Sequence, residues 1–215
     1  MTTITPTPIP SPRAPKSRIK GDARRAKFLE AATAIILEHG VSAVTMEEVA
    51  LRTDVNKRLG YRYFANREEL LCALFELKMA EVTRCVAAAM PPEPSLADII
   101  SINIRVWMDL TDRDGPVLSR LFSDQDVIPE MAREIVDRSN RNWARTLQDT
   151  LTMPPAAAET LARILLTGVR GAVEALGAAT ASAEQIAEIY AVAALASAQA
   201  VAAQSRPATA TDATA

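Results

Sequence analysis

The feature that most constrains the fold is the regular recurrence of helix start signals along the chain. Short polar residues that can cap a helix are followed, three positions later, by a side chain that can bond back to the cap. Strand-like alternation is missing, and glycine is scarce, with seven residues in 215. We therefore predict an all-α fold. The four cap pairs are Thr45 and Glu48, Asn66 and Glu69, Ser95 and Asp98, and Ser182 and Gln185.

The cap signals and the prolines together divide the chain into about nine helices. Proline is tolerated in the first turn of a helix but not in its interior, so Pro91-Pro92 and Pro154-Pro155 mark boundaries. Gly40, directly after His39, is typical of a helix C-terminus. The predicted helices span residues 22–39, 46–53, 57–63, 67–90, 95–111, 116–123, 129–150, 155–176 and 182–204.

Composition separates the two ends of the chain from its middle. Five of the 13 prolines precede residue 16, so we predict a disordered, basic, Pro-rich arm over 1–20 and a disordered tail over 205–215. Between them we predict an N-terminal unit, 21–75, and a larger helical unit, 76–204. Residues 1–75 hold 12 Lys and Arg against 8 Asp and Glu, whereas the remaining 140 hold 12 against 18. This asymmetry suggests a basic functional end joined to an acidic body.

Charge and composition exclude several classes of protein. The net charge is −2, so any nucleic-acid binding must come from a local basic region. Two cysteines and one histidine argue against a disulfide framework and a zinc site, and we expect neither a metal nor a cofactor. The sequence shows no signal peptide and no strongly apolar span, so we expect a cytoplasmic, nucleoid-associated protein that does not bind a membrane.

The stretch 45–71 is the part of the chain whose pattern points to a function. Thr45 caps a short helix, and the tight turn after it contains Asp54, which tolerates a left-handed backbone. Asn56 then caps a very short helix, and Asn66 caps a third. A longer helix followed by two short helices that a tight turn joins is the layout of a helix-turn-helix DNA-binding motif.

The second short helix of this motif is strongly basic. Lys57 and Tyr61 share one face, and Arg58 and Arg62 share another, because each pair is four residues apart. Such a helix buries little by itself, and its natural use is to lie in the major groove of DNA. The alternative interpretation is a solvated basic face beside core tyrosines.

Three stretches of this region resemble the tetracycline-repressor (TetR) family of bacterial transcription regulators. The resemblance covers about residues 24–75, whereas the remainder matches only in length and helicity. It implies an N-terminal three-helix DNA-binding domain and a C-terminal helical bundle for dimerisation and ligand binding. The stretches are ARRAKFLEAATAIILEHG (23–40), VTMEEVA (44–50) and YRYFANREELL (61–71).

The resemblance also implies which residues would contact DNA. Lys57, Arg58 and Leu59 occupy the positions that face base edges, and Leu59 is suited to a thymine methyl group. Glu47 would lie where some members of the family read a base. Phosphate contacts are implied for Thr45, Tyr61, Tyr63 and Arg67, and Arg62 completes the predicted set.

The turn and the second short helix depart from the family pattern. Asp54 stands where the family usually has glycine, and Gly60 where it usually has an apolar residue; Arg58 and Leu59 replace small residues. Because glycine inside a helix costs about 0.5–1 kcal/mol relative to alanine, we predict a recognition helix that DNA must order. These departures bear on which base sequence is read.

The N-terminal arm supplies a second candidate contact with DNA. Residues 1–27 carry seven basic residues against one acidic residue. Such an arm can follow the backbone or enter the minor groove, although it can equally serve only to keep the chain soluble.

The last two long helices are rich in small residues. Gly168 and Gly171 lie in one, and Ala187, Ala191 and Ala194 lie in the other at helical spacing. The family resemblance implies that these helices form a homodimer interface. Ordinary packing within one chain is the alternative.

Two tryptophans with nearby polar side chains are candidates for an effector pocket. A mostly apolar cavity with a few polar anchors is typical of small-molecule sites. The alternative is that both tryptophans are simply core residues. The predicted lining residues are Asn103, Trp107, Phe122, Trp143 and Leu147.

The sequence as a whole therefore predicts a homodimeric DNA-binding regulator. We expect it to repress by covering a pseudo-palindromic operator until a small, mostly apolar effector binds. An enzyme is not expected, because phosphate loops, metal clusters and nucleophile elbows are all missing from the sequence. The alternative function is a helical regulator with a degenerate DNA reader that acts through protein contacts.

Overall fold

Four helices begin directly after the residues that were predicted to cap them. In the computed structural model, which describes residues 16–54, 57–123 and 129–205, all four cap side chains accept a backbone N–H bond from the residue three positions on. Ser95 and Ser182 form complete capping boxes. At Thr45 the reciprocal bond is replaced, because Glu48 accepts instead from Arg52 Nε at 3.0 Å. The local polar pattern was thus sufficient to place these helix starts.

The described residues form nine α-helices and one short 3-10 helix, and no strand is found among them. The all-α prediction is confirmed. The helices are α1 Lys16–His39, the 3-10 helix η1 Val41–Ala43, α2 Met46–Arg52, α3 Lys57–Gly60, α4 Arg67–Ala89, α5 Leu96–Asp114, α6 Val117–Ser123, α7 Pro129–Leu151, α8 Pro155–Gly177 and α9 Ala183–Gln204.

Three helix ends differ from the predicted ones by more than one residue. Helix α1 begins at Lys16, so the predicted disorder is wrong for residues 16–20 of the arm. Residues 1–15 of the arm lie outside the described part of the chain. Helix α3 ends at Gly60, and a turn over 61–63 follows where helix was predicted, because glycine is a poor helix former. Helix α5 runs on to Asp114 and stops only at Gly115, whose φ is 77°. Of the predicted tail, only Ser205 is described, as the cap of α9.

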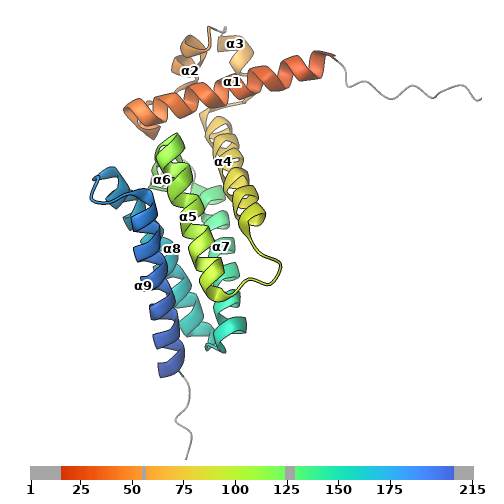
Figure 1. Cartoon of the computed structure of the whole chain (residues 1–215). Coiled ribbons are helices and arrows are strands. Elements are labelled where there is room, and N and C mark those ends of the chain that lie inside the picture. Colours follow the sequence, from red (N-terminus) through yellow and green to blue (C-terminus); the bar gives the residue numbers. More distant parts are fainter. Residues whose placement is uncertain (1–15, 55–56, 124–128, 206–215) are drawn as a thin grey trace, which may run out of the picture.

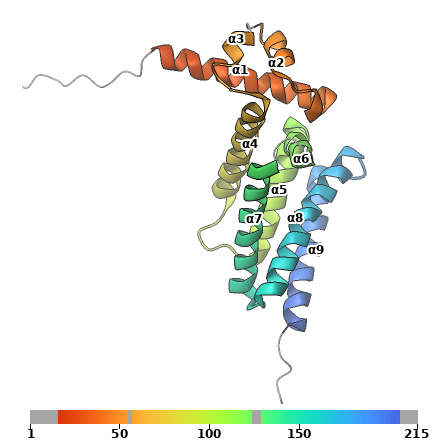
Figure 2. The same cartoon turned by 180° about the vertical axis from the view of Figure 1, so that it is seen from behind.

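Helix α1 lies across one end of an upright bundle that is built from α4 to α9 (Figure 1). Helices α2 and α3 sit on the side of α1 that faces away from this bundle, and the view from behind shows the same arrangement (Figure 2). Helix α4 descends from this end alongside the body. The two short helices therefore form the outer end of the molecule.

One continuous core joins the N-terminal helices to the body. Phe28, Ile35 and Ile36 of α1 are fully buried in it, together with residues of α2 and α4. The same cluster continues into α6 at Leu121 and into α7 at Ile135. The predicted boundary after residue 75 falls inside α4, so this helix belongs to both units.

Two further cores hold the lower body together. One combines α5, α7, α8 and α9 around Leu147 and Ala198, and the other combines α5, α8 and α9 around Met108 and Ala187. Tyr190 of α9 donates from its hydroxyl to the carbonyl oxygen of Leu165 in α8 at 2.5 Å, and burial raises the pKa of Tyr190 to about 12. Helices α8 and α9 are thus fixed to each other within one chain.

Helix α9 is unusually apolar for a helix on the outside of a bundle. It is the helix of the described chain that is long and apolar enough to cross a membrane by length and composition. Only 28% of its apolar stretch is buried. The remaining residues of this stretch are partly buried or exposed.

Candidate nucleic-acid interface and effector region

The turn between α2 and α3 has the backbone geometry that the sequence suggested. Asp54 adopts a φ of 51°, in the left-handed region that aspartate tolerates better than most residues. The Thr53 hydroxyl donates to the carbonyl oxygen of Val49 at 2.9 Å, which ties the turn to α2. At the other end of α2, the Thr45 hydroxyl accepts from the Glu48 N–H at 3.1 Å and is exposed.

Gly60 has a packing role that the sequence-based argument did not include. It is buried, and a Cβ atom placed there would lie 3.2 Å from Phe28 Cε1 and 3.6 Å from Met46 Cε. The missing side chain therefore lets α3 approach α1 and α2 closely. The departure from the apolar residue usual in the family has a local cause in this packing.

Several predicted DNA ligands are exposed on the outer end of the molecule. Arg58 and Arg62 are exposed, as is Glu47 on α2, and the Tyr61 side chain is 44% exposed. Tyr63 differs, because it is half-buried and its ring centroid lies 6.0 Å from that of Phe28. The structure does not describe the side chains of Lys57 and Leu59, which were also predicted to contact DNA.

Arg67, predicted to hold a phosphate, makes hydrogen bonds inside the fold. Its Nε donates to the carbonyl oxygen of Val44 at 2.6 Å, and its Nη2 donates to that of Val41 at 2.9 Å. These bonds fix the start of α4 to the segment that leads into α2. Arg67 therefore positions Thr45 and the first turn of α2 from below.

Two further cationic contacts within the N-terminal unit were missed at the sequence level. Arg52 of α2 pairs with Glu38 of α1 at 2.8 Å and lowers the pKa of that carboxyl group. The Arg25 guanidinium carbon lies 5.0 Å from the centroid of the Phe64 ring. Neither pair has a helical i,i+4 spacing, so only the fold brings the partners together.

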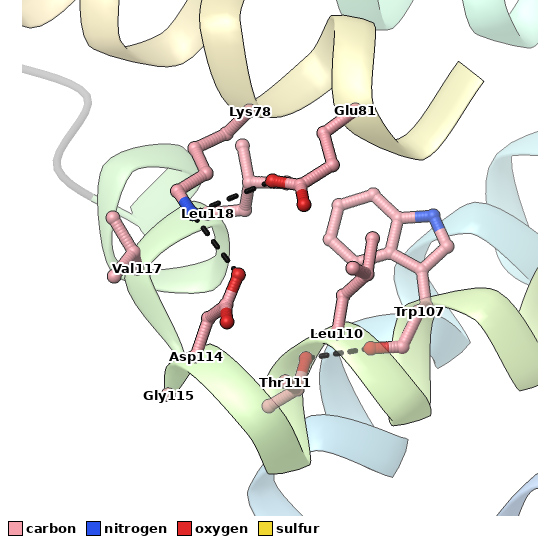
Figure 3. Close-up of a pocket in the computed structure, with 9 residues that line it drawn as sticks. All are labelled: Lys78, Glu81, Trp107, Leu110, Thr111, Asp114, Gly115, Val117 and Leu118. Atoms are coloured by element: carbon pink, nitrogen blue, oxygen red, sulfur yellow. Dashed lines mark hydrogen bonds and ion pairs between the residues drawn. The ribbon is translucent and has the colours of Figure 1, made fainter. Parts of the chain in front are cut away.

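The corner between α5 and α6 is tied to α4 by ion pairs. Asp114 lies 3.1 Å from the Lys78 ammonium and 2.7 Å from Arg113 Nε, and Arg113 also reaches Glu81 at 2.6 Å. The Arg113 guanidinium, with Lys78 as a further partner, holds the pKa of Asp114 at about 2. Lys78 and Glu81 extend from α4 across the gap to this corner (Figure 3).

The same corner is also attached to the end of α1. Arg120 of α6 donates from Nη1 to the carbonyl oxygens of Ile36 and Leu37, the second at 2.8 Å. Gly115 packs so closely on Leu37 that a Cβ atom there would lie 2.6 Å from Leu37 Cδ2. The α5–α6 corner therefore contacts both helices, α1 and α4, on which α2 and α3 are mounted.

A small pocket lies beneath this corner. Its volume is about 20 Å³, whereas cavities that enclose small-molecule ligands typically measure about 300–1,000 Å³. An effector would have to widen it. The lining residues are Lys78, Glu81, Trp107, Leu110, Thr111, Asp114, Gly115, Val117 and Leu118 (Figure 3).

The predicted effector-binding residues fall into two groups. Trp107 lines the pocket, and the centroid of the Phe122 ring lies 6.2 Å from that of the Trp107 ring. Trp143 and Leu147 instead pack in the core shared by α5, α7, α8 and α9. Asn103 donates from Nδ2 to the carbonyl oxygen of Ile99 in its own helix. Of these five residues, Trp107 is the one that lines the described pocket.

The outward face of α8 and α9 exposes large apolar side chains. The exposed fractions are 60% for Ile164, 66% for Ile189 and 65% for Val192. Gly168 and Gly171 are exposed on α8; a Cβ atom at Gly168 would lie 3.2 Å from Tyr190 Cε2 of α9, whereas nothing lies within 4 Å of one at Gly171. Large apolar side chains that are exposed on neighbouring helices are candidates for an interface.

Comparison with known proteins was consistent with this geometry. Residues 28–74 match the family described as bacterial regulatory proteins, tetR family. Over 88 residues the chain is 30% identical to the HTH-type transcriptional repressor SCO4008 of Streptomyces coelicolor, covering 41% of this chain and 40% of that protein. Over 99 residues it is 31% identical to the HTH-type transcriptional repressor Rv3405c of Mycobacterium tuberculosis, covering 46% of each. The chain thus spans less than half the length of these relatives.

Similarity in structure extends over most of the chain. A bacterial regulatory protein of the tetR family from Rhodococcus RHA1 superposes with a TM-score of 0.66, covering 80% of this chain and 95% of that one. The two sequences are 20% identical, so this comparison supports the fold. The C-terminal body therefore has a known architecture although its sequence is diverged.

Proposed function

We propose that this chain, whose residues 28–74 match the tetR family of bacterial regulatory proteins, is a member of that family and represses transcription by binding operator DNA as a homodimer. The observation that carries the proposal is the location of α2 and α3 at the outer end of the molecule, with Arg58 and Arg62 exposed. A DNA target implies a cytoplasmic protein. An enzymatic activity is no part of the proposal.

In the proposed complex α3 lies in the major groove. Lys57, Arg58 and Leu59 read base edges, while Thr45 and Tyr61 contact phosphates on either side. Glu47, Arg62 and Tyr63 border this surface. The internal bonds of Arg67 favour a positioning role, with its remaining N–H groups available for a phosphate.

The exposed apolar face of α8 and α9 supports the proposed homodimer. A second copy would cover Ile164, Ile189 and Val192, and water would be removed from their side chains. Two copies related by a two-fold axis would present two α3 helices. To read one face of B-DNA, these helices must lie about 34–36 Å apart.

The proposed release mechanism uses the α5–α6 corner. An apolar effector that widens the pocket near Trp107 would displace Asp114 and Gly115. The corner is joined to α1 by the hydrogen bond from Arg120 and to α4 by the ion pair between Asp114 and Lys78. Both helices would therefore shift with it. Operator affinity falls if the effector prefers the conformation in which the two α3 helices are wrongly spaced.

The proposal is tested by measuring the affinity of the protein for the DNA upstream of its own gene. Fluorescence anisotropy across a salt series gives this affinity. Because phosphate contacts release counterions, affinity should fall steeply as salt rises. Tyr61→Phe should weaken all sequences alike and leave the salt slope unchanged, because the phenol hydroxyl carries no charge, whereas Arg58→Ala should change the preference among sequences. Arg163→Ala, an exposed residue on α8, is the matched control.

Equal, shallow binding to all sequences would contradict the proposal. It would favour the alternative regulator with a degenerate reader that acts through protein contacts. Unchanged affinity and preference in Arg58→Ala and Lys57→Ala would show that α3 is not the reading element.

A further inference from the structure

Asn140, in the middle of α7, has a buried oxygen atom that the fold does not use. It is the one buried polar side chain among those described, with 9% of its surface exposed. Its Oδ1 atom has no hydrogen-bond partner. A buried acceptor without a donor costs free energy, and native structures rarely keep one without a reason. This oxygen is therefore a candidate for contact with a molecule from outside the chain.

The position of Asn140 points to the interior of the body. Ile135, five residues earlier on α7, belongs to the core that α7 shares with α1, α4 and α6. Ala144 and Leu147, later on the same helix, belong to the core shared with α5, α8 and α9. Trp143 is half-buried against this second core. Asn140 shares a face of α7 with Ala144 and Leu147, four and seven positions later, so it is buried on the side of α7 that enters the second core.

We propose that Asn140 Oδ1 accepts a hydrogen bond from the effector. The effector is then a largely apolar molecule that carries an N–H or O–H donor, because the surroundings of the acceptor are apolar. This inference rests on the proposed function, since it names the chemistry of the proposed effector, and it adds a contact on α7 outside the lining of the pocket near Trp107. A ligand of the same shape without the donor would leave the oxygen unsatisfied and bind more weakly.

Indole and benzofuran are suitable probes, because they share a shape and only indole has an N–H donor. Calorimetric titration of the full chain, without DNA, should show indole binding at least about tenfold more tightly than benzofuran. Asn140→Leu, which has a similar volume, should bind both probes alike. It should also melt at a higher temperature than the parent protein, because the unsatisfied oxygen is gone. Asn142→Leu, exposed on the same helix, is the control and should keep the preference.

Equal binding of both probes, no binding of either, or a preference that persists in Asn140→Leu would overturn the inference. So would a lower melting temperature of Asn140→Leu, because it would mean that Oδ1 is satisfied within the protein. Operator binding by the same variants is measured separately. If the parent protein did not bind the operator but still preferred indole, the proposed function would be contradicted and the Asn140 site would be supported.

Discussion

Single residues of the N-terminal unit serve the fold and the proposed surface at once. Arg67 matches a phosphate-binding position of the family, yet it bonds the carbonyl oxygens of Val41 and Val44. Gly60 departs from the family pattern, yet its missing side chain lets α3 approach Phe28. A residue type at a matched position therefore indicates a role only together with what surrounds it.

Substitution of Gly60 tests this packing argument. Gly60→Leu should lower the free energy of unfolding by about 1–3 kcal/mol, because the added side chain meets Phe28 and Met46. Gly21→Leu is the control: nothing lies within 4 Å of a Cβ atom there, and a helical glycine is replaced. It should raise the free energy by about 0.5–1 kcal/mol. Urea denaturation of both variants checks the pair, and a neutral Gly60→Leu would show that α3 is not closely packed.

Asp114 should make stability depend on pH in the acid range. Its carboxyl pKa is about 2 in the folded chain, below the value of about 3.9 in an unfolded chain. Its stabilising contribution is therefore complete above about pH 4 and is lost as pH falls through about 2. Asp114→Asn should lower the free energy of unfolding by about 1 kcal/mol at pH 7, after allowance for solvent screening.

The difference in free energy of unfolding between Asp114→Asn and the parent protein should change little at pH 4 and shrink clearly when urea denaturation is repeated at pH 3. Asp109→Asn, an exposed aspartate on the same helix, is the control. A difference that stays constant from pH 7 to pH 3 would exclude the ion pairs with Arg113 and Lys78 as its cause.

At the level of elements, the α5–α6 corner is the junction between the outer end and the body. Helix α4 is covalently continuous through both units, but α1 is joined to the body through α6 by Arg120 and through the corner at Gly115. A movement of α6 would therefore be transmitted to the helix that supports α2 and α3. The contact is specific, because it uses carbonyl oxygens near the C-terminal end of α1.

Removal of the Arg120 guanidinium should loosen α1 from the body. Arg120→Gln should lower the free energy of unfolding by about 1–3 kcal/mol, because it deprives the carbonyl oxygens of Ile36 and Leu37 of a donor. Hydrogen exchange should speed up locally, near the end of α1. Arg105→Gln, exposed on α5, should change neither measurement. Unchanged exchange near residue 37 in Arg120→Gln would argue against the coupling.

At the level of the whole molecule, a single chain leaves its most apolar helix largely uncovered. Helix α9 packs one face against α5 and α8, while Ile189 and Val192 remain exposed beside Ile164 of α8. This face lies on the body, away from α2 and α3. A second copy bound there would leave both outer ends available to DNA.

A charge on that face should separate the two copies. Ile189→Glu should convert a dimer into a monomer in sedimentation equilibrium, because burying the carboxylate would cost more than the contact supplies. Operator affinity should fall with it. Leu77→Glu is the matched control, because Leu77 is 51% exposed but lies on α4. If Ile189→Glu stayed dimeric and Leu77→Glu did not, the interface would have to involve α4 instead.

Local signals in the sequence determined the helices of this protein and the turn of its DNA-binding motif. Caps such as Ser95 and the left-handed Asp54 act through the backbone within a few residues, so the order of residues alone reveals them. The tertiary structure decided what distant residues do to one another. It bonded Arg120 to α1 across 84 positions, placed Gly60 against Phe28, packed Trp107 and Trp143 against different cores, and left the Oδ1 atom of Asn140 without a hydrogen-bond partner. Such contacts depend on how helices pack, and helix packing joins residues whose separation along the chain carries no periodic signal.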